Sequence, residues 1–596
     1  MARSSTTSKS PKPAKKKSEP TEPLLTQKNF EQELKALASK AKEETWSKWA
    51  TGQALVLLQS GTLLTLSAIY SNASQLTLSP IYGSIPASIW HSQGVMAACF
   101  LGWSFNLFIR RRSPVKPVTL LPVIAAYIPV VQFFMFKISG FMGAVYGPII
   151  TEAVTFFPLL LLSVSSTATT LDDLDMNPGR LPWLFDAMPG ISSYAFYRTM
   201  EYLSGKYIQQ TIGSTFIHTR LGLEILLAGL YSIFAPSKLL LYALPAVLHT
   251  AIFNYHVPHA TSWLNASMTK TGWSLIDRQE SLTGYVSIIQ SAEDGFKVMR
   301  CDHSLLGGEW LATQSPSGLA EPIYGVFVML EAVRLVVVPQ PVPDEQSSAL
   351  VIGLGIGTTP SAFITHGIDT TIVEIDPVVH SFATTYFSLP PNHTPVIADA
   401  VAYASETAKE GKQYTYIVHD VFTGGAEPVD LFTLEFIQDL HAMLAPWGVI
   451  AINYAGDLTL PSALIVIRTI KSVFPRCRIY RESPAPPPAQ ILEDGRDFIN
   501  MVIFCTKESS NDQITFRDPT EADLLGSRAR EMFLLPRHEV DERAFEESNE
   551  KGEGPSGMRI LRKNETEEFT PWLQKSALGH WEVMRTVLPP EIWEQW

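Results

Sequence analysis

A chain of 596 residues is too long for one hydrophobic core, so two to four structural units are expected. Hydrophobic residues make up 46% and charged residues only 17%, whereas a soluble protein carries about 25% charged residues, which favours a part that lies in lipid. The net charge of −12 argues against nucleic acid as the main partner, because phosphate contacts need clustered Lys and Arg.

Residues 1–50 predict a disordered basic tail followed by a polar helix. Positions 1–17 hold several basic residues and no acid, and a charged stretch from Glu31 to Lys48 precedes the first apolar run. This order argues against a secretory signal, in which the apolar segment follows the basic start closely. The positive-inside rule places the tail in the cytosol.

Apolar runs between residues 51 and 256 predict a transmembrane helical bundle, since about 20 apolar residues span a bilayer. The runs cover residues 52–70, 89–109, 117–138, 142–165, 216–235 and 238–254, and an interrupted run covers 183–200. The interrupted run contains Asp186 and Pro189, and it fits a broken span, a re-entrant piece or an interfacial helix. We expect six to eight spans.

Loop residues predict the orientation of this bundle. Arg110–Arg112 follow the second span and are expected in the cytosol. Asn72 begins an acceptor sequon, Asn72-Ala73-Ser74, which would then lie in a lumenal loop. An even number of crossings places the C-terminal half in the cytosol as well. The identity of the membrane is left open.

Three acids lie within or beside the apolar spans, where ionisable groups are expensive and often functional. They are Glu152, Asp186 and Glu224. Glu224 can pair with Arg220, four residues earlier on the same helix face. Glu152 can hydrogen-bond inside the bundle. A transport role is the competing interpretation.

The four cysteines, Cys99, Cys301, Cys477 and Cys505, are far apart and show no CxxC spacing. This pattern predicts small buried hydrophobic residues rather than a disulfide framework or a zinc site. No metal is expected.

From residue 272 the sequence pattern changes to short strands, which indicates a small β module over 272–335. Residues 285–290 and 296–300 are strand-like, and Ser291–Gly295 between them predict a hairpin turn. Residues 322–334 then carry apolar side chains at helical spacing.

Residues 345–510 predict a Rossmann-like nucleoside-binding domain. An aliphatic strand runs into Gly353, Gly355 and Gly357, and a helix follows. Glycines at such a turn let backbone N–H groups approach a ligand at the helix N-terminus. The alternation of strands and helices downstream predicts a doubly wound sheet with its ligand at the carboxyl ends of the strands.

Acids end three successive strands of this domain. Glu374 follows the glycine turn by about twenty residues and suits the hydroxyls of a ribose. Asp399-Ala400 place an acid where it suits an adenine amino group, and Asp420 lies at the crevice where such folds carry out chemistry. Asp376 is expected to cap a helix that begins at Pro377.

From about residue 280 to 505 the chain resembles the spermidine synthase (polyamine aminopropyltransferase) family, and more closely its membrane-attached relatives. The segments that carry the resemblance are Asp302–Gly308, Pro322–Gly325, Gly353–Gly357, Val373–Pro377, Asp399-Ala400, Asp420 and Leu431–Phe436. The resemblance implies decarboxylated S-adenosylmethionine or S-adenosylmethionine as co-substrate. It places the ribose on Glu374, the adenine on Asp399, and the glycine turn beside the ribose and methionine part. Asp420 would be the catalytic acid that accepts a proton from the attacking amine.

Three positions depart from the family pattern. Ile356 stands where the family has an Asp between its glycines, and Thr423 stands where a second acid follows the catalytic one. The Tyr-Gln pair that the family has near the end of the β module is Tyr324-Gly325 here. Each lost charge-assisted contact weakens the binding of a dicationic substrate by roughly 1.5–3 kcal/mol. The departures favour a substrate other than a polyamine, or no catalysis.

Residues 511–596 predict an acidic, partly disordered tail with a Trp-rich end. The tryptophans are Trp572, Trp581, Trp593 and Trp596. They fit either docking onto the domain or an interfacial membrane contact.

The expected fold is therefore an N-terminal multi-span α-helical membrane domain followed by a small β-hairpin module and an α/β Rossmann-like domain. The expected function is that of a membrane-anchored spermidine synthase-like transferase that transfers an aminopropyl group to an amine. The alternatives are an S-adenosylmethionine-dependent methyltransferase and a catalytically inactive, nucleoside-sensing membrane protein. The expected partners are the lipid bilayer, the nucleoside and an amine, with a homodimer left open. The N-terminus and the C-terminal domain of this multi-pass protein are both expected in the cytosol.

Overall fold

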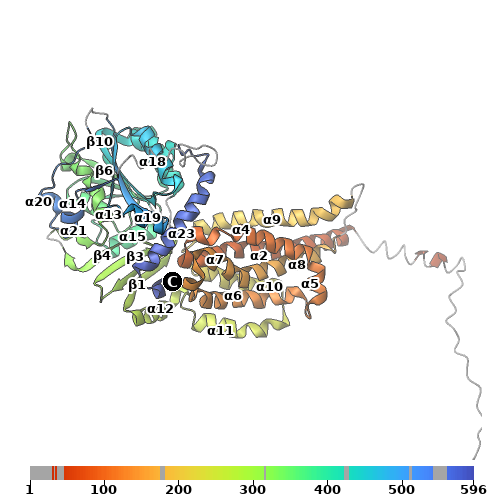
Figure 1. Cartoon of the computed structure of the whole chain (residues 1–596). Helices are drawn as coiled ribbons and strands as arrows, with labels where there is room; N and C mark the ends of the chain where they lie inside the picture. The colour runs from red at the N-terminus through yellow and green to blue at the C-terminus, as the bar shows by residue number, and fades with distance from the viewer. Residues whose placement is uncertain are drawn as a thin grey trace, which may run out of the picture.

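The computed structural model describes residues 30–32, 34–35, 46–174, 182–314, 317–421, 428–508, 513–540 and 560–596. An elongated helical bundle is built from the N-terminal part of the chain, and an α/β domain lies at one end of it (Figure 1). A small antiparallel sheet and the helix α23 (Thr570–Val587) lie at the junction. Nearly all of the predicted basic tail falls outside the described residues.

The bundle is organised around α2 (Trp46–Tyr82), a helix of 37 residues that packs against α8, α9 and α10. The remaining elements of the bundle and its junction are α3 (Ser84–Ser88), α4 (His91–Ser104), α5 (Asn106–Arg112), η1 (Pro117–Leu120), α6 (Leu121–Phe136), α7 (Ser139–Val154), α8 (Phe156–Leu171), α9 (Pro182–Thr211), α10 (Arg220–Phe234), η2 (Lys238–Ala243), α11 (Leu244–Ile252), η3 (Pro258–Ala260), α12 (Thr261–Met268) and η4 (Thr269–Thr271). Buried apolar residues such as Tyr70, Val95 and Phe156 form its core.

Within the described ranges, two helices are long and apolar enough to cross a membrane, Lys48–Tyr82 and Pro117–Phe136. Two bent helix pairs raise the number to four if each counts as one span: α4 with α5 (together with α3), bent by 67°, and α7 with α8, bent by 42°. This finding does not support six to eight spans. The runs near 216–235 and 238–254 form helices that are too short, and α9, which covers the interrupted run, carries charged residues.

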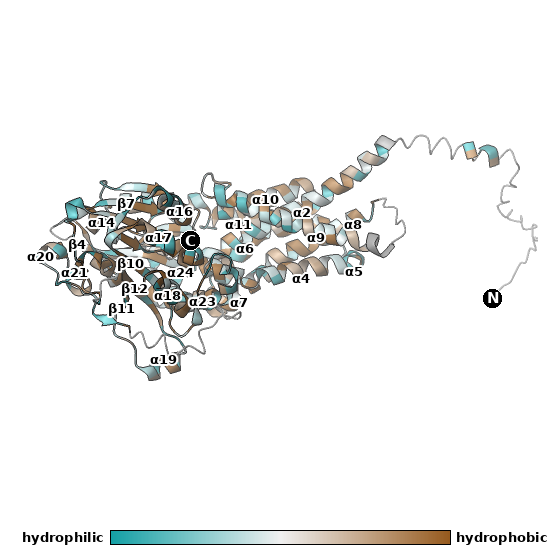
Figure 2. Cartoon of the chain, turned by 90° about the horizontal axis from the view of Figure 1, so that it is seen from above, coloured by the Kyte–Doolittle hydropathy of each residue, from teal (hydrophilic) through white to brown (hydrophobic). Residues whose placement is uncertain are grey.

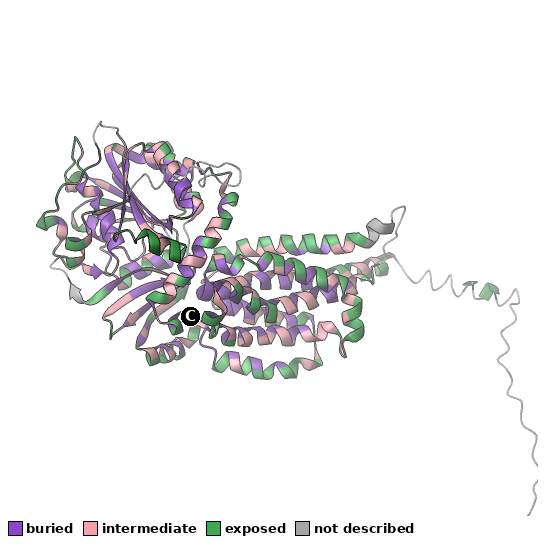
Figure 3. Ribbon diagram, in the orientation of Figure 1, coloured by how far each residue is buried: buried purple, intermediate pink, exposed green. Residues whose placement is uncertain are grey.

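Large apolar side chains are exposed on the outside of the bundle. Leu58, Phe100, Phe108 and Phe141 are examples. Hydrophobic residues lie along the outer helices as well as in the sheet of the α/β domain (Figure 2), and many residues of α9 and α11 are exposed (Figure 3). Large exposed apolar patches are uncommon on monomeric soluble proteins and generally mark interaction sites.

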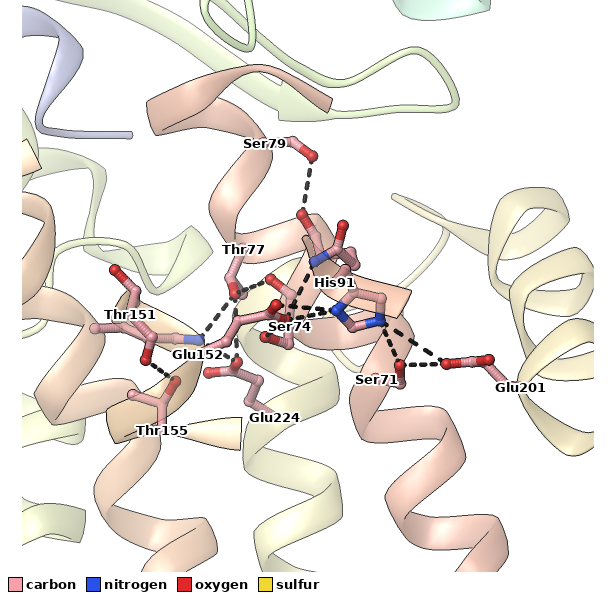
Figure 4. A network of polar contacts seen from close by, with 12 residues as sticks. Ser71, Ser74, Thr77, Ser79, His91, Thr151, Glu152, Thr155, Glu201 and Glu224 are labelled. Carbon is pink, nitrogen blue, oxygen red and sulfur yellow. Dashed lines mark hydrogen bonds and ion pairs between the residues drawn. The ribbon is translucent and has the colours of Figure 1, made fainter. Parts of the chain in front are cut away.

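Polar side chains form a buried network inside the bundle (Figure 4). The His91 ring lies between Glu152 and Glu201. Its Nδ1 is 2.9 Å from the Glu152 carboxylate, and its Nε2 is 2.8 Å from the Ser71 hydroxyl. Ser71 in turn donates a hydrogen bond to Glu201 at 2.5 Å. The prediction that Glu152 hydrogen-bonds inside the bundle is confirmed. The side chain of Asp186 lies outside the described residues.

The expected pairing of Arg220 with Glu224 is wrong. Arg220 begins α10 and donates hydrogen bonds to Glu280 at 3.1 Å and to Asp302 at 3.2 Å, both in the β module. Glu224 instead accepts one from Gln132 inside the bundle at 2.9 Å. A buried ion-pair cluster between domains, which only the tertiary structure creates, therefore replaces the local pair.

Asn72 lies within α2 and not in a loop. Its side-chain amide donates to the carbonyl oxygen of Glu201 at 2.8 Å and to Ser204 at 3.0 Å, both on α9. An amide held between two packed helices is closed to glycosylation, so the predicted lumenal acceptor site is wrong.

The β module is an antiparallel sheet in sequential strand order. Its strands are β1 (Trp273–Glu280), β2 (Tyr285–Ser291), β3 (Phe296–Cys301), β4 (Ser304–Gln314) and β5 (Ala320–Pro322). The antiparallel pairing of β2 with β3 confirms the predicted hairpin. Val286 and Met299 face the α/β domain, whereas Tyr285 packs with residues of the bundle and Trp596.

The α/β domain contains an eight-stranded mixed sheet in the order β13-β11-β12-β10-β9-β6-β7-β8. The strands are β6 (Ser348–Ile352), β7 (Asp369–Glu374), β8 (Thr394–Ile397), β9 (Tyr414–His419), β10 (Leu444–Asp457), β11 (Cys477–Arg481), β12 (Phe498–Thr506) and β13 (His538–Glu539). Strands β8, β7, β6, β9 and β10 are parallel, and β12 is antiparallel to β10 and β11. The predicted Rossmann-like fold is confirmed, with antiparallel strands added at one side.

Helices cover both faces of this sheet. They are α13 (Gly325–Met329), η5 (Leu330–Leu335), α14 (Thr358–Thr365), α15 (Pro377–Tyr386), α16 (Ala400–Glu410), α17 (Leu434–Met443) and α18 (Pro461–Val473). The shorter helices of this part of the chain are η6 (Asp344–Gln346), η7 (Val429–Phe432), α19 (Pro488–Asp494), α20 (Glu521–Leu524), α21 (Arg528–Phe533) and η8 (Thr566–Phe569). The last helix, α24 (Pro590–Trp593), packs with the β module and the bundle. α17 and α18 pack against one face, and α13, η5 and α21 pack against the other.

Cys477 and Cys505 form a disulfide between the paired strands β11 and β12, with their Cα atoms 4.2 Å apart. The expectation that no disulfide forms is therefore wrong. The two residues are 28 positions apart in the sequence, and only the strand register brings them together. Cys99 and Cys301 are free and buried, as predicted.

The C-terminal tryptophans dock onto the protein itself. Trp593 and Trp596 are almost completely buried. The Arg300 side chain donates hydrogen bonds to the carbonyl oxygens of Ile592 and Gln595, each at 2.7 Å, and to that of Pro80 at the end of α2 at 2.6 Å. Of the two open interpretations, docking is the correct one for these residues.

Candidate functional site

The glycine turn after β6 has the conformation that the sequence predicts. Gly353, Gly355 and Gly357 have φ angles of 85°, 54° and 88°, in the left-handed region that favours glycine. A Cβ atom on Gly353 would lie 2.0 Å from the Asp420 carbonyl oxygen, and one on Gly355 would lie 2.5 Å from that of Leu306 in β4. The first glycine therefore lets two strand ends meet, and the second lets the β module close over the turn.

Glu374 ends β7 beside this turn. Its carboxylate accepts hydrogen bonds from the backbone N–H groups of Leu354 at 3.0 Å and Asp376 at 2.9 Å. Burial raises the pKa of Glu374 to about 7. Each carboxylate oxygen keeps a further lone pair, so the group fits the two hydroxyl donors of a ribose.

Asp376 caps α15 as predicted, accepting from the Val378 N–H at 2.8 Å. The same carboxylate also accepts a hydrogen bond from the Ser281 hydroxyl at 2.6 Å and contacts Thr283. Both residues lie in the turn between β1 and β2. The cap thus joins the β module to the half of the domain that carries Glu374.

Asp399 follows β8 and is exposed. One carboxylate oxygen accepts from the Val401 N–H at 2.9 Å and caps α16, which begins at Ala400. The other oxygen has no recorded partner among the described residues and can accept a hydrogen bond from an amino group. Asp399 and Ala400 follow the strand at the end of the sheet, which is two strands from the strand before the glycine turn.

Asp420 follows β9 and is partly accessible. The Asn453 side-chain amide donates a hydrogen bond to its carboxylate at 2.8 Å. Burial raises the pKa of Asp420 to about 6, although the hydrogen bond from Asn453 acts in the opposite direction. A half-desolvated carboxylate of this kind can accept a proton near neutral pH.

Asn453 was not predicted from the sequence. The available signal is a single polar residue within the otherwise apolar strand Val449–Tyr454. The strand register decides its role. Ile452 of β10 pairs with His419 of β9, and the next residues along the chain, Asn453 and Asp420, therefore lie side by side.

The structure brings Gly353, Glu374 and Asp420 together at the carboxyl ends of β6, β7 and β9. The Gly353 N–H donates to Val373 at 2.9 Å, and the Asp420 N–H donates to Ile352 at 2.8 Å. The chain order reverses between β6 and β9, and ligands of open α/β sheets bind at such a switch point.

Ile356 packs in an apolar cluster and also lines a small pocket beside Gly357 and Thr358. It is 5% exposed and packs with Leu354 and Val286, against Gly307 of β4. An acid at this position would be buried among hydrocarbon side chains. Thr423 lies outside the described residues. Within the described part of the chain, no cluster of His, Cys, Asp and Glu has a metal-binding arrangement.

No known family model matches the chain. It is 50% identical over 551 residues to an N-terminal histidine N-methyltransferase from Emericella nidulans, and the match covers 91% of this chain and 97% of that protein. A polyamine aminopropyltransferase from Vibrio vulnificus is 31% identical over 167 residues, which are 27% of this chain and 50% of that protein.

Solved structures with a similar fold include a probable spermidine synthase from Corynebacterium glutamicum. It has a TM-score of 0.35 and 15% identity, covering 49% of this chain and 96% of that one. Human methyltransferase-like protein 13, solved with SAH, has a TM-score of 0.24 and 24% identity, covering 36% of this chain and 92% of that one.

Proposed function

The chain belongs to the family of N-terminal histidine N-methyltransferases, and on this premise we propose that it transfers a methyl group from S-adenosylmethionine to a nitrogen of a histidine at the start of a polypeptide. The structural observation that supports this most is the crevice at the carboxyl ends of β6, β7 and β9. Glu374, the glycine turn and the Asp420–Asn453 pair all lie there.

The expected aminopropyl transfer to an amine is wrong. The relative that matches almost the whole chain is a methyltransferase, whereas the aminopropyltransferase match covers 27% of the chain. The structure supplies a physical reason at one position, since Ile356 is packed in the core where an acid would be needed. The alternative interpretation, an S-adenosylmethionine-dependent methyltransferase, is the better one.

Glu374 and Asp399 are the groups that hold the nucleoside in this proposal. Glu374 takes the ribose hydroxyls, and its backbone partners Leu354 and Asp376 keep its carboxylate in place. Asp399 takes the adenine amino group through the oxygen that does not cap α16. Gly353, Gly355 and Gly357 keep the turn free of side chains beside the methionine part.

Asp420 is the proposed catalytic base. The bound sulfonium supplies an electrophilic methyl carbon. The acceptor nitrogen attacks this carbon with its lone pair, the carbon–sulfur bond breaks, and its electron pair stays on sulfur as the thioether forms. Positive charge develops on the imidazole ring, and the Asp420 carboxylate stabilises that charge and accepts the proton carried by the other ring nitrogen. Asn453 holds the carboxylate in position.

The test uses the purified full-length protein, S-adenosylmethionine with a deuterated methyl group, and a synthetic peptide that begins with histidine. The expected result is one labelled methyl group on the first residue, located by fragmentation mass spectrometry. A matched peptide with histidine at its third position is the control. Label on neither peptide, or on lysine or arginine, would contradict the proposed function.

For location, we propose a membrane-attached protein whose α/β domain faces an oxidising compartment. The two candidate spans and the exposed apolar surface of the bundle support the attachment. The Cys477–Cys505 disulfide supports the compartment and disfavours the cytosolic placement expected from the count of spans, since structural disulfides are rare in the cytosol.

The exposed sequon Asn392-His393-Thr394 tests this location. A glycosidase-sensitive mass shift that disappears in Asn392→Gln is expected when the protein is made in its own cells. An unmodified Asn392 together with reduced, alkylatable Cys477 and Cys505 would place the domain in the cytosol.

A further inference from the structure

The carboxyl edge of the large sheet continues beyond Asn453 to the end of β11. β10 and β11 are both antiparallel to β12, so they run in the same direction. Asn453 and Tyr480 pair with the same residue of β12, Val502. Glu482 follows β11 directly and therefore lies at the same edge as Asp420, on the opposite side from the nucleoside-binding residues.

The separation between Glu482 and Asp420 follows from the strand order. β9 and β11 are separated by β10 and β12, which makes three strand spacings of about 4.8 Å, or roughly 14 Å between the strand ends. Side chains from both ends reduce the gap between the two carboxylates.

The β module covers this stretch of the edge. Leu306 of β4 lies against Gly355 of the glycine turn. Beyond β5, the Gly325 N–H donates a hydrogen bond to Glu482 Oε1 at 2.9 Å. Asp420 and Asn453 lie between these two contacts, so a molecule bound between the module and the sheet edge would meet both Asp420 and Glu482.

Glu482 is a half-buried carboxylate. Burial raises its pKa, and only the backbone N–H groups of Gly325 and Val326 act against that effect. No Lys or Arg ion pair is recorded for it among the described residues. The neighbouring Arg481 is occupied by Asp497, with nitrogen–oxygen distances of 2.9 and 3.1 Å. Tyr324 lies close enough to Glu482 for its negative charge to help burial raise the tyrosine pKa to about 12.

A partly desolvated carboxylate with no cation is unfavourable until a cation binds to it. A histidine at the start of a polypeptide differs from an internal histidine by its α-amino group, whose usual pKa of about 7.7–8.0 leaves it largely protonated at neutral pH. An acid at the acceptor side of the crevice is therefore complementary to the group that distinguishes the two.

We propose that Glu482, with the Tyr324 side chain beside it, binds the protonated α-amino group of the acceptor and thereby selects a histidine at the start of the chain. The inference rests on the proposed function and names the residues that would give it its specificity. Glu482 is a positioning residue, since it holds the acceptor and takes no part in breaking or forming the transferred bond.

The test compares two peptides of one sequence beginning with histidine, one with a free amino terminus and one acetylated. In the full-length wild type, kcat/KM should be about 100-fold higher for the free peptide. Glu482→Gln should reduce this preference about 10- to 100-fold, mainly by raising the KM for the free peptide. Its kcat/KM for the acetylated peptide and its KM for S-adenosylmethionine should stay within about twofold.

Two features protect this test from a folding defect. Glutamine keeps a carbonyl oxygen that can accept from the Gly325 N–H, and the thermal unfolding temperature of the variant is measured alongside. Glu493→Gln, an exposed acid on α19, is the matched control and should leave the preference unchanged. Tyr324→Phe should reduce the preference by a smaller factor than Glu482→Gln.

Equal loss of activity toward both peptides in Glu482→Gln would indicate a purely structural role and overturn the inference alone. A wild type that methylates both peptides equally well would also overturn it and leave the methyltransferase assignment intact. Methylation of neither peptide would remove the proposed function, and the inference with it.

Discussion

The side-chain amide of Asn453 holds the carboxylate of Asp420 at 2.8 Å across two neighbouring parallel strands. The two residues are 33 positions apart in the chain. They are brought together because the residues before them, Ile452 and His419, are paired between β10 and β9. This hydrogen bond fixes the acid at the crevice and favours its ionised form.

Replacing Asn453 by Ala should shift the acid limb of the pH profile to higher pH. The amide lowers the pKa of Asp420, which burial raises to about 6, so its loss raises that pKa further. A hydrogen bond to a charged group is worth roughly 1.5–3 kcal/mol, which corresponds to about one to two pH units. The measurement is kcat/KM against pH with a histidine peptide. An unchanged midpoint would show that Asn453 does not act on the acid.

Asp420→Asn should separate binding from chemistry. The new side chain is nearly isosteric, and its carbonyl oxygen can still accept from Asn453, but it cannot accept a proton. We expect kcat to fall about 10²- to 10⁴-fold, the range of general base catalysis, while the affinity for S-adenosylmethionine changes less than about threefold. Single-turnover kinetics and calorimetric titration measure the two quantities. Full activity in the variant would remove Asp420 from the mechanism.

Glu374 should make nucleoside binding depend on pH. Burial raises its pKa to about 7 in the free protein, and hydroxyl donors from a ribose favour the ionised form. The pKa of Glu374 is then lower in the bound state than in the free protein. The affinity for S-adenosylmethionine should therefore increase as pH rises through about 7 and weaken below it. Glu374→Gln should bind about 10- to 100-fold more weakly and lose this dependence. The same pH dependence in the variant would assign it to another group.

An acid at position 356 should destabilise the protein and should not restore aminopropyl transfer. Ile356 is 5% exposed in an apolar cluster, and an isolated buried charge is strongly unfavourable. Ile356→Asp should reduce the free energy of unfolding by more than about 3 kcal/mol, and the matched Ile356→Val by about 1 kcal/mol. Thermal denaturation of both variants tests this. A stable Ile356→Asp protein would mean that the side chain reaches solvent.

The local features of the candidate site were predictable from the sequence. Gly353, Gly355 and Gly357 have the left-handed conformations that a tight turn requires, and Asp376 caps a helix that begins at Pro377. Both features depend on residues within a few positions of one another. The hairpin of β2 and β3 is of the same kind.

Pairings between distant segments were not predictable. Arg220 pairs with Glu280 and Asp302 rather than with Glu224, and Cys477 forms a disulfide with Cys505. Sequence proximity favoured an ion pair between Arg220 and Glu224. No spacing motif indicated the disulfide between Cys477 and Cys505. Both outcomes depend on which surfaces meet once the domains are packed.

The sequence by itself determined the strand–turn–helix alternation, the glycine turn and the acids that end β7, β8 and β9, because these follow from period, turn chemistry and helix capping. Only the tertiary structure decided that Asn453 holds Asp420, that Glu482 lies at the same edge, and that Ile356 belongs to the core. The physical reason is that strand order and register bring residues from distant positions to one edge, and neither can be derived from spacing along the chain.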